Sequence, residues 1–399
     1  MVSLLLPVIY LTFISLGLPD AVLGAAWPSI YPEFGVPVSY AGIISLTISA
    51  MTVVSSLNSD RLTRRFGPSW VTVVSVAMTA TALFGFSISH SMVALILWAI
   101  PYGLGAGSID AALNNYVALH YASRHMSWLH CMWGVGATLG PYILGLALNG
   151  GRPWNMGYRW ISFIQIGITL ILLLSLPLWK KMDAQNAEDS GAEEHRKAMT
   201  LKQIIRVPGA KEIMFAFFCY AAVVATGFLW TASYLTLNRG VSAELAATMS
   251  SILFIGMTVG RALNGFLTIK FSDRQLIFFG AAVVAVGLIV LVLPIHSTHL
   301  ALAGILLLGL GCAPIYPCII HSTPAHFGAD KSQAIVGVQM ASAYSGTTLM
   351  PPLFGLIANH ISISLFPYYI GLVLILMTVM YARLERVTAD QQARYHGVD

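Results

Sequence analysis

Charged side chains are scarce in this chain. Asp, Glu, Lys and Arg make up 9% of its 399 residues, while hydrophobic residues make up 57%. Soluble domains carry roughly 25% charged residues. Apolar runs recur here that are long enough to cross ~30 Å of hydrocarbon, a distance that takes about 20 helical residues. The composition excludes a soluble globular protein and predicts an all-α integral membrane protein that crosses the bilayer many times.

Cysteine is scarce as well. The four cysteines fall in apolar runs without metal-ligand spacing, so we expect packing residues and no disulfide framework. Glycine-rich strings such as GLGAG follow no strand and carry no lysine, and we interpret them as helix-packing sites rather than nucleotide loops. No nucleophile–base set or extramembrane catalytic domain is evident in the sequence. We therefore expect no enzyme activity, no metal and no organic cofactor.

Twelve membrane-spanning helices are predicted from the apolar runs. Their approximate bounds are 4–31, 37–58, 68–89, 91–118, 126–149, 157–179, 211–236, 243–269, 274–294, 298–321, 332–359 and 363–384. The first segment lacks the cationic start of a signal peptide and is too long for its apolar region, so we interpret it as a span.

The Lys and Arg residues indicate the orientation. Most of the 21 fall in segments that are inside when both termini are cytoplasmic, and few fall in the opposite loops. The net charge of +5 is therefore a sign of topology, and we expect no nucleic-acid partner. The predicted location is the plasma membrane, which is the cytoplasmic membrane if the source is bacterial.

A single long polar stretch, 180–208, divides the spans into two sets of six. We interpret it as a cytoplasmic linker, with a short surface helix starting at Thr200. The predicted domains are an N-terminal six-helix bundle at 1–179, this linker, and a C-terminal six-helix bundle with a short tail at 209–399.

The two halves contain similar sequences at an offset near 206–210. GLGAGSID (103–110) matches GLGCAPIY (309–316), and GATLGPYILG (136–145) matches GTTLMPPLFG (346–355). Repeats of this kind are typical of transporters whose halves move around a central site. With six spans on each side of a central loop, the chain resembles the major facilitator superfamily, which implies that fold and transport by alternating access.

The loop predicted after the second span, SLNSDRLTRRFG (56–67), strengthens this resemblance. It resembles the superfamily signature Gly-x-x-x-Asp-Arg-x-Gly-Arg-Arg, with Asp60, Arg61, Arg64 and Arg65 in register. A carboxylate beside several cations at a helix end can hold one conformation by pairing with a neighbouring helix end. We therefore expect Asp60, Arg61 and Arg65 to form a conformational latch. Arg261, which lies within a predicted span, is expected to brace the same half of the membrane.

Two carboxylic acids, Asp20 and Asp110, lie deep inside predicted spans. Such groups are expensive in a bilayer unless they are protonated, paired or facing water. An acid that is neutral in hydrocarbon and ionised when water reaches it couples proton movement to conformational change. The alternative is structural: each Asp hydrogen-bonds a neighbouring helix or pairs with Arg261.

The segment Asp110-Ala-Ala-Leu-Asn-Asn-Tyr resembles the fourth-span Glu-Thr-Ala-Ala-Asn-Pro-Tyr pattern of the fucose–galactose–glucose proton symporters, the fucose permease branch. That branch also carries a first-span Asp, which Asp20 matches. The resemblance implies that Asp20 and Asp110 couple protons. The fifth span has His130 and Trp133 where the branch has Gln-x-x-Asn, a departure that puts fucose itself in doubt.

Residues that share a helix face with these acids, or occupy comparable positions in other spans, are candidates for binding the solute. Asn114 follows Asp110 by one turn, and His130 and Trp133 are three residues apart. For each of them, packing or an interhelical hydrogen bond is the alternative. The full set of predicted substrate contacts is Trp27, Asn114, His130, Trp133, Trp230, Tyr316 and Gln339.

We therefore predict a secondary active transporter that moves a small polar solute, a sugar or sugar-like molecule, together with protons. The protein is expected to act as a monomer in the lipid bilayer. The alternatives are a proton-driven exporter of amphipathic compounds, because GATLGPYILG also resembles an antiporter signature, and a sodium-coupled sugar transporter. A receptor or scaffold that has lost transport is a further alternative.

Overall fold

The computed structural model describes residues 4–20, 22–37, 40–190, 199–241, 243–293 and 297–396, and within them it contains helices and no strand. The part of the predicted linker at 191–198 lies outside the described residues. The helices of the first half are α1 (Leu5–Gly17), α2 (Val22–Glu33), α3 (Ala41–Ser87), α4 (Met92–His120), α5 (Ser123–Asn149) and α6 (Trp154–Ser190).

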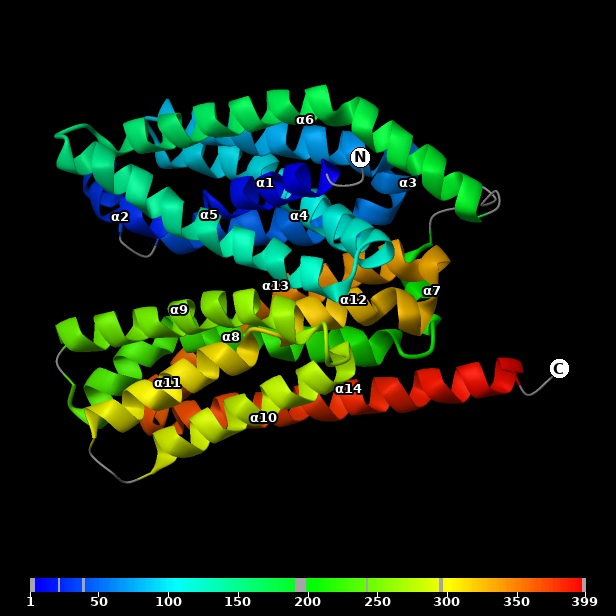
Figure 1. Ribbon diagram of the computed structural model, residues 1–399. Coiled ribbons are helices and arrows are strands. Elements are labelled where there is room, and N and C mark those ends of the chain that lie inside the picture. The colour runs from blue at the N-terminus through cyan, green and yellow to red at the C-terminus, as the bar shows by residue number, and fades with distance from the viewer. Residues whose placement is uncertain are drawn as a thin grey trace. The chain divides into compact units, whose positions relative to one another are not determined.

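The second half begins with a short helix and continues with long apolar ones (Figure 1). Its elements are α7 (Leu201–Arg206), α8 (Ala210–Arg239), α9 (Ala243–Leu267), α10 (Asp273–Val292), α11 (Thr298–Cys312), α12 (Ile315–Phe327), α13 (Ala329–His360), the 3-10 helix η2 (Ile363–Leu365) and α14 (Phe366–His396). The short helix expected from Thr200 is present as α7. The Thr200 side chain caps it and Gln203 completes a capping box.

Each of the twelve predicted spans is matched by helical structure. The second and third spans form one element, α3, with a kink at Gly67, whose φ of 77° is unfavourable for other residues. The signature segment that we expected to be a loop is therefore helical as far as this kink, because no helix-breaking residue precedes Gly67. Within the described residues, nine helical stretches are long and apolar enough to cross a membrane.

The first and tenth predicted spans are each divided in two. The break between α1 and α2 contains Pro19, and the break between α11 and α12 contains Pro314. Proline lacks the backbone N–H that continues a helix and clashes with the preceding turn. The first break places Asp20 between two helices rather than inside one, which is a correction to the continuous span that we predicted.

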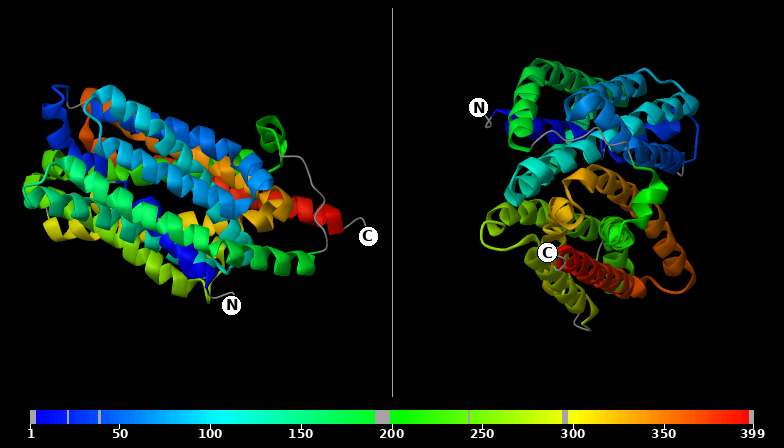
Figure 2. Two further views of the ribbon diagram at one scale, coloured as in Figure 1. Left: turned by 90° about the horizontal axis from the view of Figure 1, so that it is seen from above. Right: turned by 90° about the vertical axis from the view of Figure 1, so that its right-hand side faces the viewer.

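Two compact units are present. The first comprises Met1–Tyr116 and Leu129–Met199, and the second comprises Val117–Trp128 and Thr200–Asp399. In the first unit α3 packs against α6, and in the second α8 packs against α13 and α14 while α11 packs against α9 and α10. Within each unit the long helices run lengthwise beside one another (Figure 2).

Two pairs of glycines at matching positions make matching contacts in the two halves, whereas the third matched pair, Gly145 and Gly355, does not. A Cβ at Gly136 would overlap the carbonyl oxygen of Ile14 on α1, and a Cβ at Gly346 would overlap that of Phe218 on α8. These glycines therefore let α5 approach α1, and α13 approach α8, with their backbones in contact.

A second pair of glycines follows the same rule. Gly103 brings α4 against the Ile48 carbonyl of α3, and Gly309 brings α11 against the Leu253 carbonyl of α9. The sequence repeat is thus a repeat of helix packing: the fourth and tenth spans contact the second and eighth in the same way.

Candidate functional site

Asp110 is the first member of a buried polar chain in the first unit. The Asn114 side-chain nitrogen donates to Asp110 Oδ1 at 2.7 Å and to the Asp110 carbonyl oxygen at 2.9 Å. The Asn114 side-chain oxygen lies 2.9 Å from His130 Nε2. Because an amide oxygen only accepts, the imidazole donates at this nitrogen. All three side chains are buried, with exposed fractions of 5% or less.

Asp20 lies at the break between α1 and α2 and remains exposed. Trp133 Nε1 donates to Asp20 Oδ2 at 2.7 Å, and the Tyr102 hydroxyl donates to Oδ1 at 3.3 Å. The backbone N–H of Asp20 bonds the Gly17 carbonyl, which fixes the turn. The two carboxylates therefore differ in environment: Asp110 is enclosed, and Asp20 is accessible but held by two donors.

Helix α5 contributes side chains to the surroundings of both acids. His130 and Trp133 are three residues apart on one face, as we predicted from their spacing. His130 reaches the Asp110 chain through Asn114, and Trp133 reaches Asp20. His130 also packs edge-on against Phe13 of α1, with ring centroids 5.3 Å apart. The structure thus brings together five of the predicted residues: Asp20, Asp110, Asn114, His130 and Trp133.

Close packing between α1 and α5 sets this geometry. A Cβ at Gly17 would overlap the carbonyl oxygen of Trp133, and Cβ atoms at Gly136 and Gly140 would overlap the carbonyls of Ile14 and Leu18. The backbone of α5 is therefore in direct contact with the end of α1 that leads into Asp20.

The other predicted substrate contacts lie in packed surroundings. Trp27 belongs to a hydrophobic cluster of the first unit that also contains Tyr102. Trp230 donates to the Pro351 carbonyl at 2.9 Å and packs against Phe354. Both tryptophans thus make packing contacts, and Trp27 shares its cluster with Tyr102, the donor to Asp20.

Gln339 and Tyr316 are also engaged within the second unit. Gln339 is fully buried and exchanges hydrogen bonds of 3.0 and 3.2 Å with Thr323. The Tyr316 hydroxyl lies 3.1 Å from the Met340 sulfur, and its ring packs on Phe217. Tyr316 occupies the repeat position of Asp110, so the second half has an aromatic side chain where the first has an acid.

Asp60, the centre of the predicted latch, is buried and pairs with Arg64 at 2.8 Å, one helical turn away. Its other oxygen accepts the backbone N–H of Met199, at the end of the linker, at 3.2 Å. Arg61 is exposed, and the Arg65 guanidinium lies over the Phe66 ring. Asp60 therefore holds the end of the linker directly through one oxygen, while Arg64 neutralises the other.

Arg261, the remaining predicted latch residue, is buried in the second unit, where Tyr220 and Cys312 are within its electrostatic reach. The Tyr220 hydroxyl donates to the Cys312 carbonyl at 3.0 Å. These neighbours place Arg261 at the level where α8, α9 and α11 meet.

Tyr102 is a neighbour of Asp20 that sequence reasoning missed. Arg64 is in register with the signature, and helical spacing explains its pairing with Asp60, four residues before it. Tyr102 is 82 residues from Asp20, and nothing in the sequence links the two. Among the described residues there is no group of three or more His, Cys, Asp or Glu side chains that could hold a metal ion.

Comparisons with known proteins identify the class. The family model described as Major Facilitator Superfamily matches residues 9–338 and 226–397. An uncharacterized MFS-type transporter of Yersinia pestis is 24% identical over 379 residues, which cover 91% of this chain and 92% of that protein. The glucose/mannose transporter GlcP of Bacillus subtilis is 21% identical over 365 residues, covering 89% and 88% of the two chains.

The fold is also that of a solved transporter. The crystal structure of FucP in the outward conformation superposes with a TM-score of 0.76 at 13% identity and covers 95% of this chain and 98% of that one. A second crystal structure describes FucP as the fucose:proton symporter of E. coli. This protein belongs to the major facilitator superfamily: it is a multi-pass, all-helical membrane transporter of small-molecule solutes and not an enzyme.

Proposed function

We propose that this transporter carries a sugar or sugar-like polar solute together with protons by alternating access. The observation that supports the proposal best is the pair of carboxylates, Asp20 and Asp110, whose hydrogen-bond networks both include a side chain of α5. One acid, Asp110, is enclosed in a chain of hydrogen bonds with Asn114 and His130, and the other, Asp20, is accessible. The names of GlcP and FucP agree with this solute class but concern those proteins.

The proposed chemistry follows from burial. An ionised carboxylate deep in a membrane protein is costly, so Asp110 gains stability by taking a proton when its surroundings are dry. Asn114 can donate to Asp110 whether the acid is charged or neutral. It therefore links Asp110 to His130 in both charge states. Asp20, held by Trp133 and Tyr102 at the helix break, is the group that meets water and solute first.

The indole of Trp133 suits a sugar. Its ring is half-buried and its N–H is directed to Asp20, so an apolar ring lies beside an acceptor-rich carboxylate. Sugar rings combine apolar C–H faces with hydroxyl donors, so a ring can stack on the indole and donate to Asp20. We propose that both termini are cytoplasmic and that the protein acts as a monomer.

A reconstituted system tests the proposal. First, a thermal-shift screen of sugars, sugar acids and amphipathic drugs identifies a ligand, because binding to the folded state raises the melting temperature. The ligand is then added to proteoliposomes with a pH dye outside. Symport predicts external alkalinisation on solute entry; external acidification on the imposition of an inward solute gradient would instead indicate an exporter working in reverse.

Ion replacement separates the remaining alternative. If uptake follows the proton gradient and is unchanged when sodium is replaced at fixed pH, the coupling ion is the proton. Uptake that requires sodium would contradict the proposal, and a complete lack of counterflow with every ligand found would favour a receptor.

A further inference from the structure

A second polar network lies in the second unit, around the segment Val117–Trp128. This segment comprises the last turn of α4, the two residues that follow it and the first residues of α5, and it belongs to the second unit by its contacts. Asn264 of α9 donates to the Ser127 hydroxyl at 2.7 Å, and the Trp128 indole donates to the Ala262 carbonyl at 3.4 Å. The segment is therefore fastened to α9 along its last turn.

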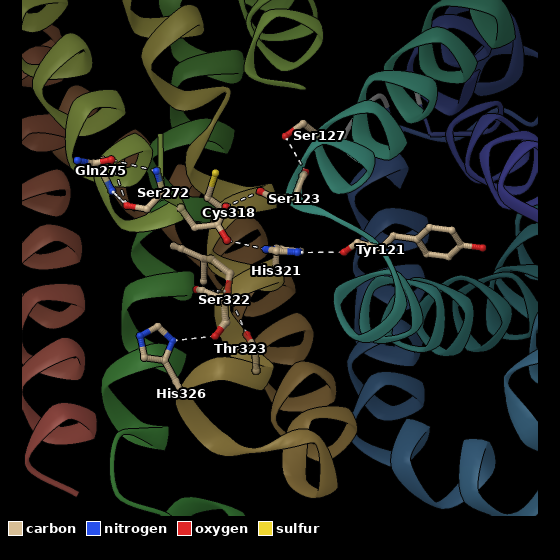
Figure 3. A network of polar contacts seen from close by, with 12 residues as sticks. Tyr121, Ser123, Ser127, Ser272, Gln275, Cys318, His321, Ser322, Thr323 and His326 are labelled. Carbon is tan, nitrogen blue, oxygen red and sulfur yellow. Dashed lines mark hydrogen bonds and ion pairs between the residues drawn. The ribbon is translucent and has the colours of Figure 1, made fainter. Parts of the chain in front are cut away.

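His321 of α12 fastens the beginning of the same segment. Its Nδ1 lies 2.6 Å from Asp273 Oδ2, and its Nε2 lies 3.1 Å from the carbonyl oxygen of Tyr121. Ser123 donates to the other oxygen of Asp273. Figure 3 shows the imidazole directed toward Tyr121, with Ser123 beside it. The histidine thus bridges α10 and the segment.

The number of protons on the imidazole decides whether both contacts can exist. A carbonyl oxygen only accepts, and so does the ionised Asp273 carboxylate to which Ser123 donates. A neutral imidazole has one N–H and can donate to only one of these two acceptors. With Asp273 as an acceptor, both contacts are hydrogen bonds only when His321 carries two protons and a positive charge.

The surroundings favour Asp273 as the partner of that charge. Charged and titratable groups on the elements packed here include Asp273 and Arg274 on α10, His120, Tyr121, Arg124 and His125 on the segment, Tyr316, Cys318 and His326 on α12, and Tyr381, Arg383, Glu385 and Arg386 on α14. Arg274 and His326 both contact Glu385, at 3.5 and 2.9 Å. His321 and Asp273 are themselves only 22% and 15% exposed.

We propose that His321 is a proton-operated clasp. In its doubly protonated form it holds the Val117–Trp128 segment on α10 and α12, and on losing a proton it releases Tyr121. Histidine is the side chain whose ordinary titration falls in the physiological pH range. The segment contains the end of α4, the helix that carries Asp110, and the start of α5, the helix that carries His130 and Trp133. Release of the clasp therefore frees the ends of the two helices that hold the proposed acid site.

The clasp itself does not depend on which solute is carried. Its effect on the acid site matters for transport only if the proposed function is correct. Hydrogen–deuterium exchange of the full-length protein in lipid nanodiscs tests it without any transport assay. Peptides covering 117–128 are followed between about pH 5.5 and 8.5, with correction for the intrinsic pH dependence of exchange. In the wild type we expect protection of this segment on the order of tenfold stronger at the acidic end.

Two matched variants give the comparison. His321→Gln keeps a polar side chain but cannot become charged, so we expect pH-independent exchange at the wild-type alkaline level. His326→Gln removes the neighbouring histidine–carboxylate contact on the same helix, and we expect it to keep the wild-type pH dependence. Melting temperatures check that each variant is folded.

If His321→Gln does not fold, Ser123→Ala and Asp273→Asn decide the matter. Ser123→Ala removes one contact to Asp273 and should lower protection while keeping its pH dependence. Asp273→Asn removes the counter-charge and should weaken protection at acidic pH. The proposal is overturned if protection of the segment in the wild type does not change with pH. It is also overturned if the full pH dependence persists in His321→Gln or in Asp273→Asn.

Discussion

In the first unit, Asp110 follows the glycines of α4 and bonds Asn114, whereas at the matching position of the second unit Tyr316 lies against the sulfur of Met340. The glycine contacts that precede these two residues are alike: Gly103 meets Ile48, and Gly309 meets Leu253. The two halves thus keep the same helix packing while their polar chemistry differs. The shared packing supplies a common helix framework, and under our proposal the acids are required in only one of the two halves.

Helices α5 and α13 show the same division. Both approach their partner through a glycine, Gly136 or Gly346. Beside Gly136, α5 presents His130 and Trp133 to the acids, whereas Gln339 on α13 forms a closed pair with Thr323. Substitutions at matching positions can therefore separate the effects on stability from the effects on proton coupling.

The largest difference is expected between Asp110→Asn and Tyr316→Phe. Asp110→Asn removes the protonatable oxygen, so uphill uptake in proteoliposomes should fall to the rate of passive leak while counterflow exchange continues. Tyr316→Phe removes one hydroxyl contact, worth about 0.5–1.5 kcal/mol of stability, and should leave uphill uptake within about threefold of the wild type. Equal loss in the two variants would show that the acid has no special role.

A second pair compares the two fully buried amides, Asn114 and Gln339. Asn114→Ala leaves the buried Asp110 and His130 without their bridge, at a cost of about 1–3 kcal/mol, and should lower coupled uptake at least tenfold. Gln339→Leu should destabilise the fold by a similar amount, measured by thermal melting, and leave the pH profile of uptake unchanged. A changed pH profile in Gln339→Leu would place proton chemistry in the second half as well.

A third pair compares the interhelical glycines. Gly136→Ala and Gly346→Ala each force a methyl group onto a carbonyl oxygen, so each should cost about 1–3 kcal/mol of stability. Only Gly136→Ala moves α5 relative to Asp20, and only this variant should change how uptake depends on pH. Gly145→Ala is the control, because no described atom lies within 4 Å of its added Cβ. Matching pH profiles for the first two variants would contradict the division between the halves.

The smallest effect is expected for the indole pair. Trp133→Phe removes a hydrogen bond to an accessible carboxylate that water can replace, so uptake should fall by less than about tenfold. Trp230→Phe removes the donor to the Pro351 carbonyl and should lower the melting temperature by a few degrees, about 1 kcal/mol, with uptake per folded protein unchanged. The reverse ranking in uptake would assign the solute contact to Trp230.

Helical spacing was sufficient to predict part of the site. Asn114 follows Asp110 by one turn, and His130 precedes Trp133 by three residues, so their common faces could be derived from the sequence. Apolar length likewise predicted the spans, and the repeat aligned Gly136 with Gly346, which the structure shows in matching interhelical contacts. In each of these cases the interaction is local or is copied between the halves.

Contacts between distant segments could not be predicted in this way. Neither the approach of Tyr102 to Asp20 nor the closed pair of Gln339 and Thr323 follows from spacing, because helix packing decides which side chains meet. Membrane helices with weak amphipathic patterns do not reveal which face is buried. The break at Pro19 was in the sequence, and its effect on α1 was underestimated because the apolar run continues past it.

Counting the protons that accompany each solute molecule tests the central claim most directly. The claim is that Asp20 and Asp110 of the first unit carry the coupled protons. In proteoliposomes the wild type should show a fixed ratio of protons to solute, and His321→Gln should keep that ratio. In the double variant Asp20→Asn and Asp110→Asn, exchange of solute should continue while its entry moves no protons. A double variant that still carries protons at the wild-type ratio would contradict the account.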